Sequence, residues 1–166
     1  RSIGQQDRIT HENERLGDRM KTGFIGAGKV GFSLGKMFAE SGLPLTGYYS
    51  RQREAAQEAA AFTGTRAYSD LCELVQDSDA IFLTVPDRAI TPVYLELRSF
   101  SLSGKQICHC SGALSARDAF PGIEETGALG LSIHPLFPVS SRYDSYRELA
   151  DAFFCLEGEK SAIPAW

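Results

Sequence analysis

The fold is decided by the stretch Thr22-Gly-Phe-Ile-Gly-Ala-Gly-Lys-Val-Gly31, in which a short apolar strand runs into a G-x-G-x-x-G loop that opens a helix. Gly26 is expected to make the tight turn, Gly28 to let a pyrophosphate approach the backbone, and Gly31 to let the helix pack closely. Free N–H groups and the helix dipole would hold the phosphates. A turn without a ligand is the alternative. The loop predicts a dinucleotide site made by Gly26, Ala27, Gly28, Lys29, Val30 and Gly31.

Beyond this loop, apolar strands alternate with helical segments. Such alternation predicts βαβ units, and therefore a doubly wound, mostly parallel Rossmann-like sheet in a three-layer α/β/α arrangement. Ser69 or Asp70 can cap one of the helices, and Asp87 another. Ligands in such sheets bind at the carboxyl ends of the strands. The expected strands are 22–26, 44–49, 66–68, 80–85, 105–110, 129–133 and 152–156; the expected helices are 30–41, 52–62, 70–75 and 89–97.

Length and composition predict a single soluble domain. The 166 residues are 43% hydrophobic and 23% charged, which is typical of a globular protein. Residues 1–19 are polar with isolated apolar residues, so we expect a tail there and the domain at 20–166. A net charge of −4 argues against a nucleic-acid partner. No apolar run approaches a membrane span or a signal peptide. The four cysteines are too few for a disulfide scaffold and form no C-x-x-C pair, which favours a reducing, cytoplasmic location.

The end of the second strand favours NADP(H) over NAD(H). An NAD site usually has an acid about 20 residues beyond the glycine loop, to bind the ribose 2′-hydroxyl. Here the segment is Tyr49-Ser50-Arg51-Gln52-Arg53, which has two cations and no acid. Arginine can hold a 2′-phosphate with charge-assisted hydrogen bonds, and Ser50 can add a hydroxyl. The alternative is that Arg51 and Arg53 are solvated residues at the start of a helix.

Two other nucleotide readings of the loop fit less well. Residues 23–29 match the opening of a P-loop, but Val30 stands where a Ser or Thr would hold magnesium. A methyltransferase that binds S-adenosylmethionine would usually have an acid at the first strand and another at the end of the second. Neither acid is present.

The loops after the fourth and fifth strands supply further candidate residues. Val85 and Pro86 are expected to contact the sugar or adenine, with Asp87 a helix cap rather than a catalyst. Ser111 and Gly112 follow the fifth strand, where they could bind a nicotinamide or a substrate. The preceding Cys108-His109-Cys110 is not expected to bind a metal, because strand alternation sends the histidine and the cysteines to opposite faces.

The sixth strand is expected to end at His134, since Pro135 should prevent the ladder from continuing. Histidine at this edge could act as an acid or base near neutral pH. A structural role for His134 remains the alternative.

These motifs together resemble a known family. The chain is similar to the N-terminal half of the Rossmann-like and DUF2520 proteins, which belong with coenzyme F420-dependent NADP reductases, pyrroline-5-carboxylate reductases and prephenate dehydrogenases. The resemblance rests on GFIGAGKVG (23–31), YSR (49–51), TVPDRAI (84–90), HCSGALS (109–115) and SIHPLFP (132–138).

The resemblance implies cofactor contacts in the glycine loop, at Ser50 and Arg51, and at Val85 and Pro86. It implies that Ser111 supports a catalytic His134, which would exchange a proton with a small-molecule substrate as hydride moves to or from NADP(H). The family does not fix that substrate. Relatives continue into an all-helical domain that closes the substrate cleft and often builds a homodimer. We therefore expect part of the substrate pocket to lie elsewhere. The alternative is a non-catalytic NADP(H)-binding or sensor module.

Overall fold

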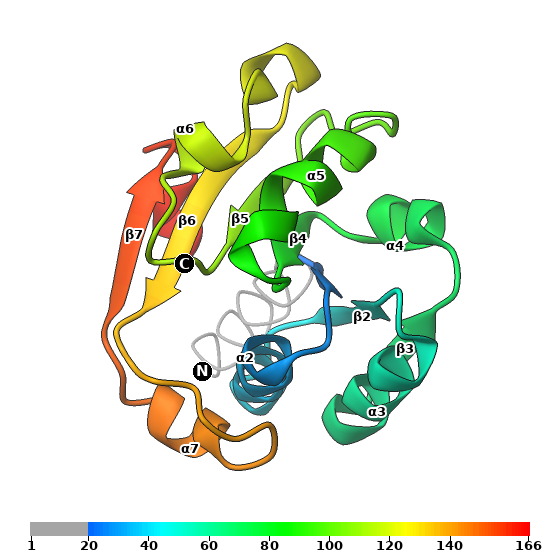
Figure 1. Cartoon of the computed structure of the whole chain (residues 1–166), viewed down its shortest axis with the longest axis vertical. Coiled ribbons are helices and arrows are strands. Elements are labelled where there is room, and N and C mark those ends of the chain that lie inside the picture. Colours follow the sequence, from blue (N-terminus) through cyan, green and yellow to red (C-terminus); the bar gives the residue numbers. More distant parts are fainter. Residues whose placement is uncertain (1–19) are drawn as a thin grey trace, which may run out of the picture.

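The computed structural model describes residues 20–166, so the expected tail at 1–19 lies outside the described residues. Strands and helices alternate as the sequence predicts (Figure 1). The strands are β1 (Thr22–Ile25), β2 (Leu45–Tyr49), β3 (Arg66–Tyr68), β4 (Ala80–Leu83), β5 (Gln106–His109), β6 (Leu129–Pro135) and β7 (Phe154–Gly158). The helices are α2 (Lys29–Glu40), α3 (Arg53–Thr63), α4 (Leu71–Asp77), α5 (Asp87–Leu97), α6 (Ala116–Ala119) and α7 (Ser145–Leu149), with short 3-10 turns η1 (Ile123–Thr126) and η2 (Ile163–Ala165).

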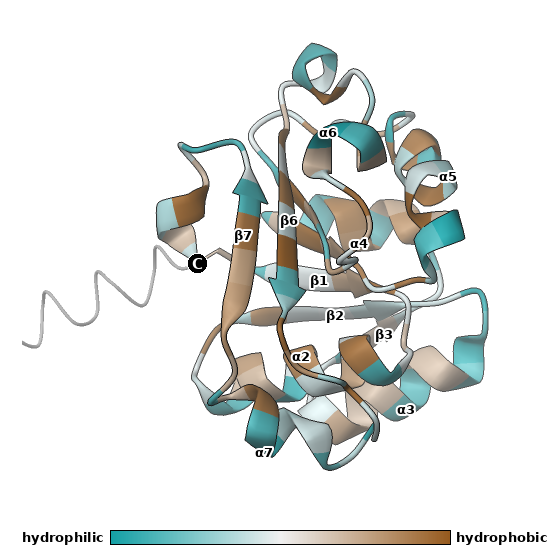
Figure 2. Ribbon diagram, turned by 60° about the vertical axis from the view of Figure 1, so that its left-hand side comes forward, coloured by the Kyte–Doolittle hydropathy of each residue, from teal (hydrophilic) through white to brown (hydrophobic). Residues whose placement is uncertain are grey.

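The seven strands of the described residues form one sheet in the order β3-β2-β1-β4-β5-β6-β7. Every pair is parallel except β6 with β7, whose arrows point in opposite directions in Figure 2. The chain order reverses between β1 and β4, so the loops that follow these two strands meet at the switch point. The doubly wound α/β fold expected from the sequence is confirmed.

Two hydrophobic clusters cover the two faces of the sheet. Side chains of α2, α3 and α7 pack on one face around Phe24, Tyr48 and Phe82. Side chains of α4, α5 and α6 pack on the other around Ile81 and Ile107. Figure 1 shows the two sets of helices on opposite sides of the strands. The strands β1, β4 and β5 are buried along their whole length, as expected for central strands of a parallel sheet.

The structure corrects the expectation that β6 ends before Pro135. Pro135 lies in the strand and pairs with Phe154 of β7. The next residue, Leu136, donates its N–H to the Phe153 carbonyl oxygen at 2.8 Å, so strand alternation turns the nitrogen of Pro135 away from β7. On that other side the pairing with β5 has ended at Ser132. The missing N–H of Pro135 therefore costs no hydrogen bond.

Helix capping was predicted correctly at one of two sites. The Asp70 carboxylate accepts the backbone N–H of Cys72 at 2.8 Å and caps α4. At α5, however, the cap is Pro86, with no side-chain hydrogen bond, and Asp87 is already the first helical residue. Asp87 is thus not a cap, because the rigid Pro86 already sets the entry into the helix; its charge still favours the positive end of the helix dipole.

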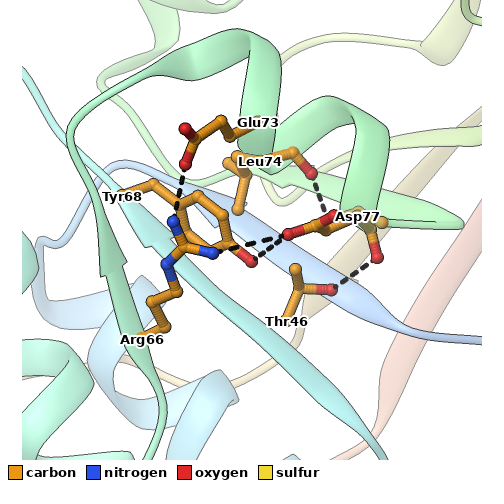
Figure 3. Close-up of polar contacts among 7 residues, drawn as sticks. Thr46, Arg66, Tyr68, Glu73, Leu74 and Asp77 are labelled. Atoms are coloured by element: carbon orange, nitrogen blue, oxygen red, sulfur yellow. Dashed lines mark hydrogen bonds and ion pairs between the residues drawn. The ribbon is translucent and has the colours of Figure 1, made fainter.

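A polar cluster fixes the edge strand β3 to α4 (Figure 3). The Arg66 guanidinium lies 2.6 Å from Glu73 Oε2 and 3.7 Å from Asp77 Oδ2, and stacks 4.3 Å from the centre of the Tyr68 ring. The Tyr68 hydroxyl donates to Asp77 Oδ2 at 2.8 Å. Arg66 is therefore paired with two carboxylates of α4.

No helix within residues 20–166 combines the length and the apolar character that crossing a membrane requires.

Candidate functional site: a groove at the carboxyl ends of the strands

The three glycines of the loop meet three different surroundings. Gly26 has φ +101, and a Cβ there would lie 2.5 Å from the Thr84 carbonyl oxygen. A Cβ on Gly31 would lie 2.6 Å from the Gly26 carbonyl oxygen. A Cβ on Gly28, by contrast, would meet nothing within 4 Å. Gly26 and Gly31 are thus required for packing inside the protein, whereas Gly28 leaves space on the outside of the loop.

The first turn of α2 offers an open anion site. Gly28 is its N-cap and provides no side-chain hydrogen bond, and the first turn has no acidic residue. Its amides and the positive end of the helix dipole therefore face the space above Gly28. The residues present fit a pyrophosphate there, because a side chain at this position would fill the space that such a group needs.

The helix is held in place by Tyr48 of β2. Its buried hydroxyl donates to the Gly31 carbonyl oxygen at 2.9 Å. A Cβ on Gly35 would collide with that hydroxyl, so the second turn of α2 also needs glycine. Burial raises the pKa of Tyr48, which keeps the phenol protonated and able to donate. The N-terminal turn of α2 is therefore fixed relative to β2.

A cavity of about 380 Å³ lies beside this turn, at the ends of β1, β2 and β4. It has an apolar side, formed by Val85, Pro86 and Val93 among others. Its charged residues come from three segments: Arg51 after β2, Glu96 on α5, and Arg142 in the loop after β6. The predicted residues that line it are Gly26, Ala27, Gly28, Ser50, Arg51, Val85 and Pro86.

A second cavity of about 370 Å³ continues from the first toward β5. The two share Gly28, Thr84, Val85 and Pro86, and together we call them the groove. Thr84, which lines both cavities, is held against the glycine loop, because its hydroxyl donates to the Gly26 carbonyl oxygen at 2.8 Å. The groove thus runs from Arg51 to Ser111, across the switch point of the sheet. The predicted residues in the second cavity are Gly28, Lys29, Val30, Val85, Pro86 and Ser111.

The two arginines after β2 are separated by the structure. Arg51 lines the groove and has no hydrogen bond or ion pair within residues 20–166. Arg53 is the first residue of α3, is exposed, and lines neither cavity. The chain enters the helix at Arg53, and this change of direction separates the two side chains. The second cation of the first cavity is instead Arg142, for which the sequence contains no local signal.

His134 lies next to the groove rather than in it. Its Nδ1 is 3.0 Å from the Cys110 carbonyl oxygen, and because a carbonyl only accepts, the neutral ring carries its proton on Nδ1. Nε2 is then a free acceptor. It lies against Gly112, where a Cβ would come within 2.7 Å of it. The structure therefore brings Gly112 and His134 together, with Ser111 as the neighbour that lines the groove.

Ser111 is bound by its own loop. Its hydroxyl accepts the Ala113 N–H at 3.1 Å, and its N–H donates to His109 Nδ1 at 3.1 Å. No hydrogen bond joins Ser111 to His134 in the described part of the chain, where the Cys110 carbonyl holds the imidazole instead. Support of His134 by the fifth-strand loop thus comes through the backbone of Cys110.

Sequence reasoning gave His109 no role beyond its place in the strand, yet it anchors this loop. It is completely buried on the face opposite to Cys108 and packs on Phe120, with ring centroids 5.4 Å apart. Burial lowers the pKa of His109, opposed by the Ser115 backbone and the charges of Glu157 and Asp87. Since Nδ1 accepts from Ser111, the proton lies on Nε2, which has no partner among the described residues. A neutral His109 is therefore needed for this arrangement.

Cys108 of β5 and Cys110, just past the end of that strand, both pack with the cluster on the other face, as strand alternation predicts. Cys108 is buried, and burial raises its thiol pKa; burial raises the pKa of Cys110 to about 12. Both thiols thus stay protonated at neutral pH. Within residues 20–166 no group of three or more His, Cys, Asp or Glu is placed to hold a metal ion.

A larger open depression, of about 1000 Å³, lies away from the groove, between α6, η1 and the β6–β7 edge. Its lining includes the carboxylates Glu124, Glu157 and Glu159, and none of the predicted site residues. An acidic surface of this kind does not fit a dinucleotide.

The sheet order, the glycine loop and the groove define the class of this protein: a doubly wound α/β domain of the dinucleotide-binding type. A family model described as Rossmann-like domain matches residues 8–135. The chain therefore belongs to the Rossmann-like domain family. No curated protein matches it in sequence.

Solved structures of several enzymes share the fold. A 3-hydroxyisobutyrate dehydrogenase from Mycobacterium tuberculosis is 20% identical, with a TM-score of 0.72 over 89% of this chain and 50% of that one. A reductive aminase from Aspergillus terreus, in complex with NADPH, is 19% identical (TM-score 0.60; 73% and 42%). An imine reductase variant from Myxococcus stipitatus, in complex with NAD⁺, is 23% identical (TM-score 0.60; 73% and 41%). The chain thus spans half or less of the length of these enzymes.

Proposed function

We propose that this chain binds NADP(H) in the groove and is the cofactor domain of an oxidoreductase that transfers hydride between NADPH and a small molecule. The observation that carries the proposal is the open space above Gly28 in a loop whose other two glycines are tightly packed. Phosphates fit there, beside the helix amides. The structurally similar enzymes with bound NADPH or NAD⁺ support a nicotinamide dinucleotide.

The preference for NADPH rests on the charge at the end of β2. Ser50 and Arg51 line the groove where an NAD site would have an acid, and Arg51 has no protein partner within residues 20–166. A 2′-phosphate adds nearly two negative charges that an arginine can hold with two hydrogen bonds. The groove reaches from Arg51 to Ser111. With the 2′-phosphate at Arg51, the nicotinamide would lie near Ser111 and Gly112.

His134 is proposed as the proton-transfer residue. When bound, the cofactor supplies the hydride chemistry. The free Nε2 of His134 is an acceptor that can take a hydroxyl proton, or return it in the reverse direction. Ser111, on the groove, would bind the substrate or the nicotinamide amide. His134 lines neither cavity, and this observation favours the second candidate, an NADP(H)-binding module without catalysis.

A titration separates these proposals. We expect NADPH to bind to the purified chain more tightly than NADH, and S-adenosylmethionine not to bind, as measured by calorimetry. If neither NADPH nor NADH binds, the cofactor proposal is wrong.

The role of His134 is tested by following NADPH oxidation with small carbonyl compounds and imines, in the wild-type protein and in His134→Ala. Loss of turnover with unchanged NADPH affinity supports the enzyme. Unchanged turnover would remove His134 from the mechanism, and NADPH binding without any turnover would favour the binding module.

A further inference from the structure

We infer that Arg142 is a second cation for the 2′-phosphate of the dinucleotide, and that it acts with Arg51 to select NADPH over NADH. The inference rests on the proposed function and deepens it. Arg142 lies 91 positions after Arg51 in the sequence, in the loop between β6 and α7, yet both line the same cavity.

The loop that carries Arg142 is fixed to the helices beside this cavity. The Ser33 hydroxyl of α2 donates to the Ser141 carbonyl oxygen at 3.3 Å. The Tyr143 ring packs edge-on against Phe32 of α2 and Phe62 of α3, with centroids 5.4 Å and 5.2 Å apart. Residues on both sides of Arg142 are thus held, and its position at the cavity follows from packing of the loop.

Contacts with Phe32 and Glu58 hold the guanidinium of Arg142, but its charge is not fully neutralised. It lies 5.2 Å from the centre of the Phe32 ring, and Nη1 is 3.4 Å from Glu58 Oε2 on α3. The two side chains are 40% and 54% exposed, and such pairs in water are weak. An arginine has five N–H donors in a planar fork, so most of them stay available for a ligand.

Its location favours the 2′-phosphate over the pyrophosphate. Arg142 lines the first cavity together with Ser50, Arg51 and Ala55, which lie at the junction of β2 and α3. It does not line the second cavity. The pyrophosphate already has the helix amides above Gly28. A phosphate monoester carries nearly two negative charges, which two arginines can balance. Among residues 20–166, Glu96 is the one carboxylate that lines this cavity, so the two cations outnumber it.

The test compares Arg142→Gln with the matched control Arg53→Gln, whose residue is exposed and outside the groove. Dissociation constants are measured by calorimetry for NADPH and NADH, and for adenosine 2′,5′-bisphosphate and adenosine 5′-monophosphate. Arg142→Gln should weaken NADPH and the bisphosphate about tenfold and the other two less than about twofold. Arg53→Gln should change none of them.

Two outcomes overturn the inference. Equal losses of affinity for NADPH and NADH would show that Arg142 contacts a part of the molecule that both dinucleotides have. An unchanged affinity for NADPH would show that Arg142 only packs against its neighbours. Glu58→Gln, which frees Arg142, should strengthen NADPH binding, and a weakening would also overturn the inference. Thermal unfolding of each variant controls for the fold. A wild-type protein that binds neither dinucleotide would instead contradict the proposed function itself.

Discussion

Arg66 and Arg51 belong to neighbouring strands, β3 and the end of β2, but differ in what neutralises them. Arg66, at the start of β3, is bound by Glu73 and Asp77 and stacks on Tyr68 (Figure 3). Arg51, just past the end of β2, lines a cavity and has no ion pair within residues 20–166. Carboxylates of the protein neutralise the first arginine, whereas the second is the one that we propose to bind an anion. The comparison teaches that the partners of a cation, rather than its residue type, separate a structural residue from a binding residue.

The largest expected effect comes from the glycine loop and tests whether the groove that Arg51 lines binds a dinucleotide. Gly28→Val should fold, because Gly28 has an extended backbone (φ −82, ψ −169) and a Cβ there meets nothing within 4 Å. The valine would fill the space proposed for the pyrophosphate. We expect a loss of at least about a hundredfold in affinity for both NADPH and NADH. Calorimetry measures it, with circular dichroism as the control for folding. Normal binding by a folded Gly28→Val would show that the loop holds no phosphate.

The next effect concerns Arg51 directly. Arg51→Glu should weaken NADPH by roughly ten- to a hundredfold, since charge-assisted hydrogen bonds contribute about 1.5–3 kcal/mol each. NADH should change little, because it lacks the 2′-phosphate. The matched control is Arg53→Glu, which makes the same charge change outside the groove. A fluorescence titration with both dinucleotides measures the difference. Equal losses for NADPH and NADH would contradict the assignment of the 2′-phosphate to Arg51.

The opposite result is expected at Arg66. Arg66→Gln should leave the affinities for NADPH and NADH unchanged and lower the free energy of unfolding by about 0.5–1 kcal/mol, because the side chain is 58% exposed and its ion pairs are partly screened. Urea denaturation measures the stability. Arg51→Gln, the partner variant, should change stability by less. If Arg66→Gln weakens NADPH binding, the contrast between the two arginines fails.

The smallest effect concerns His109, a buried residue bound to Ser111 of the groove, and the pH dependence of stability. Burial lowers the pKa of His109, so the unfolded chain binds a proton more readily than the folded one. The stabilising effect of neutral His109 is therefore complete above about pH 6.5, the ordinary histidine value, and is lost as the pH falls below it. His109→Gln should flatten the fall in the free energy of unfolding between about pH 7 and pH 5. An unchanged pH dependence would show that His109 does not control it.

The sequence predicted those features that depend on neighbouring residues. The glycine loop, the alternation of strands and helices, and the Asp70 cap follow from local rules, and each is present. The strand through Pro135 was not predicted, because it depends on β7 and on where β5 ends.

The candidate site was predictable only in part for the same reason. Gly28, Arg51 and Ser111 line the groove because each closely follows a strand, and the carboxyl ends of parallel strands meet at one edge. Arg142 lies in a loop without a motif, and long-range contacts, the packing of Tyr143 on Phe32 and Phe62 and the hydrogen bond between Ser33 and Ser141, bring it to the groove. The anchoring role of His109 was equally hidden, since it depends on a hydrogen bond to Ser111.

The central claim is that a diphosphate binds to the amides at the N-terminus of α2. The most direct test is an NMR titration of the ¹⁵N-labelled protein with NADPH, which reports on each backbone amide separately. We expect the largest shifts at Gly28, Lys29 and Gly31, with further shifts near Arg51 and none around Arg66. Saturating NADPH that leaves the loop amides unmoved, or moves only those around Glu73 and Asp77, would contradict the account.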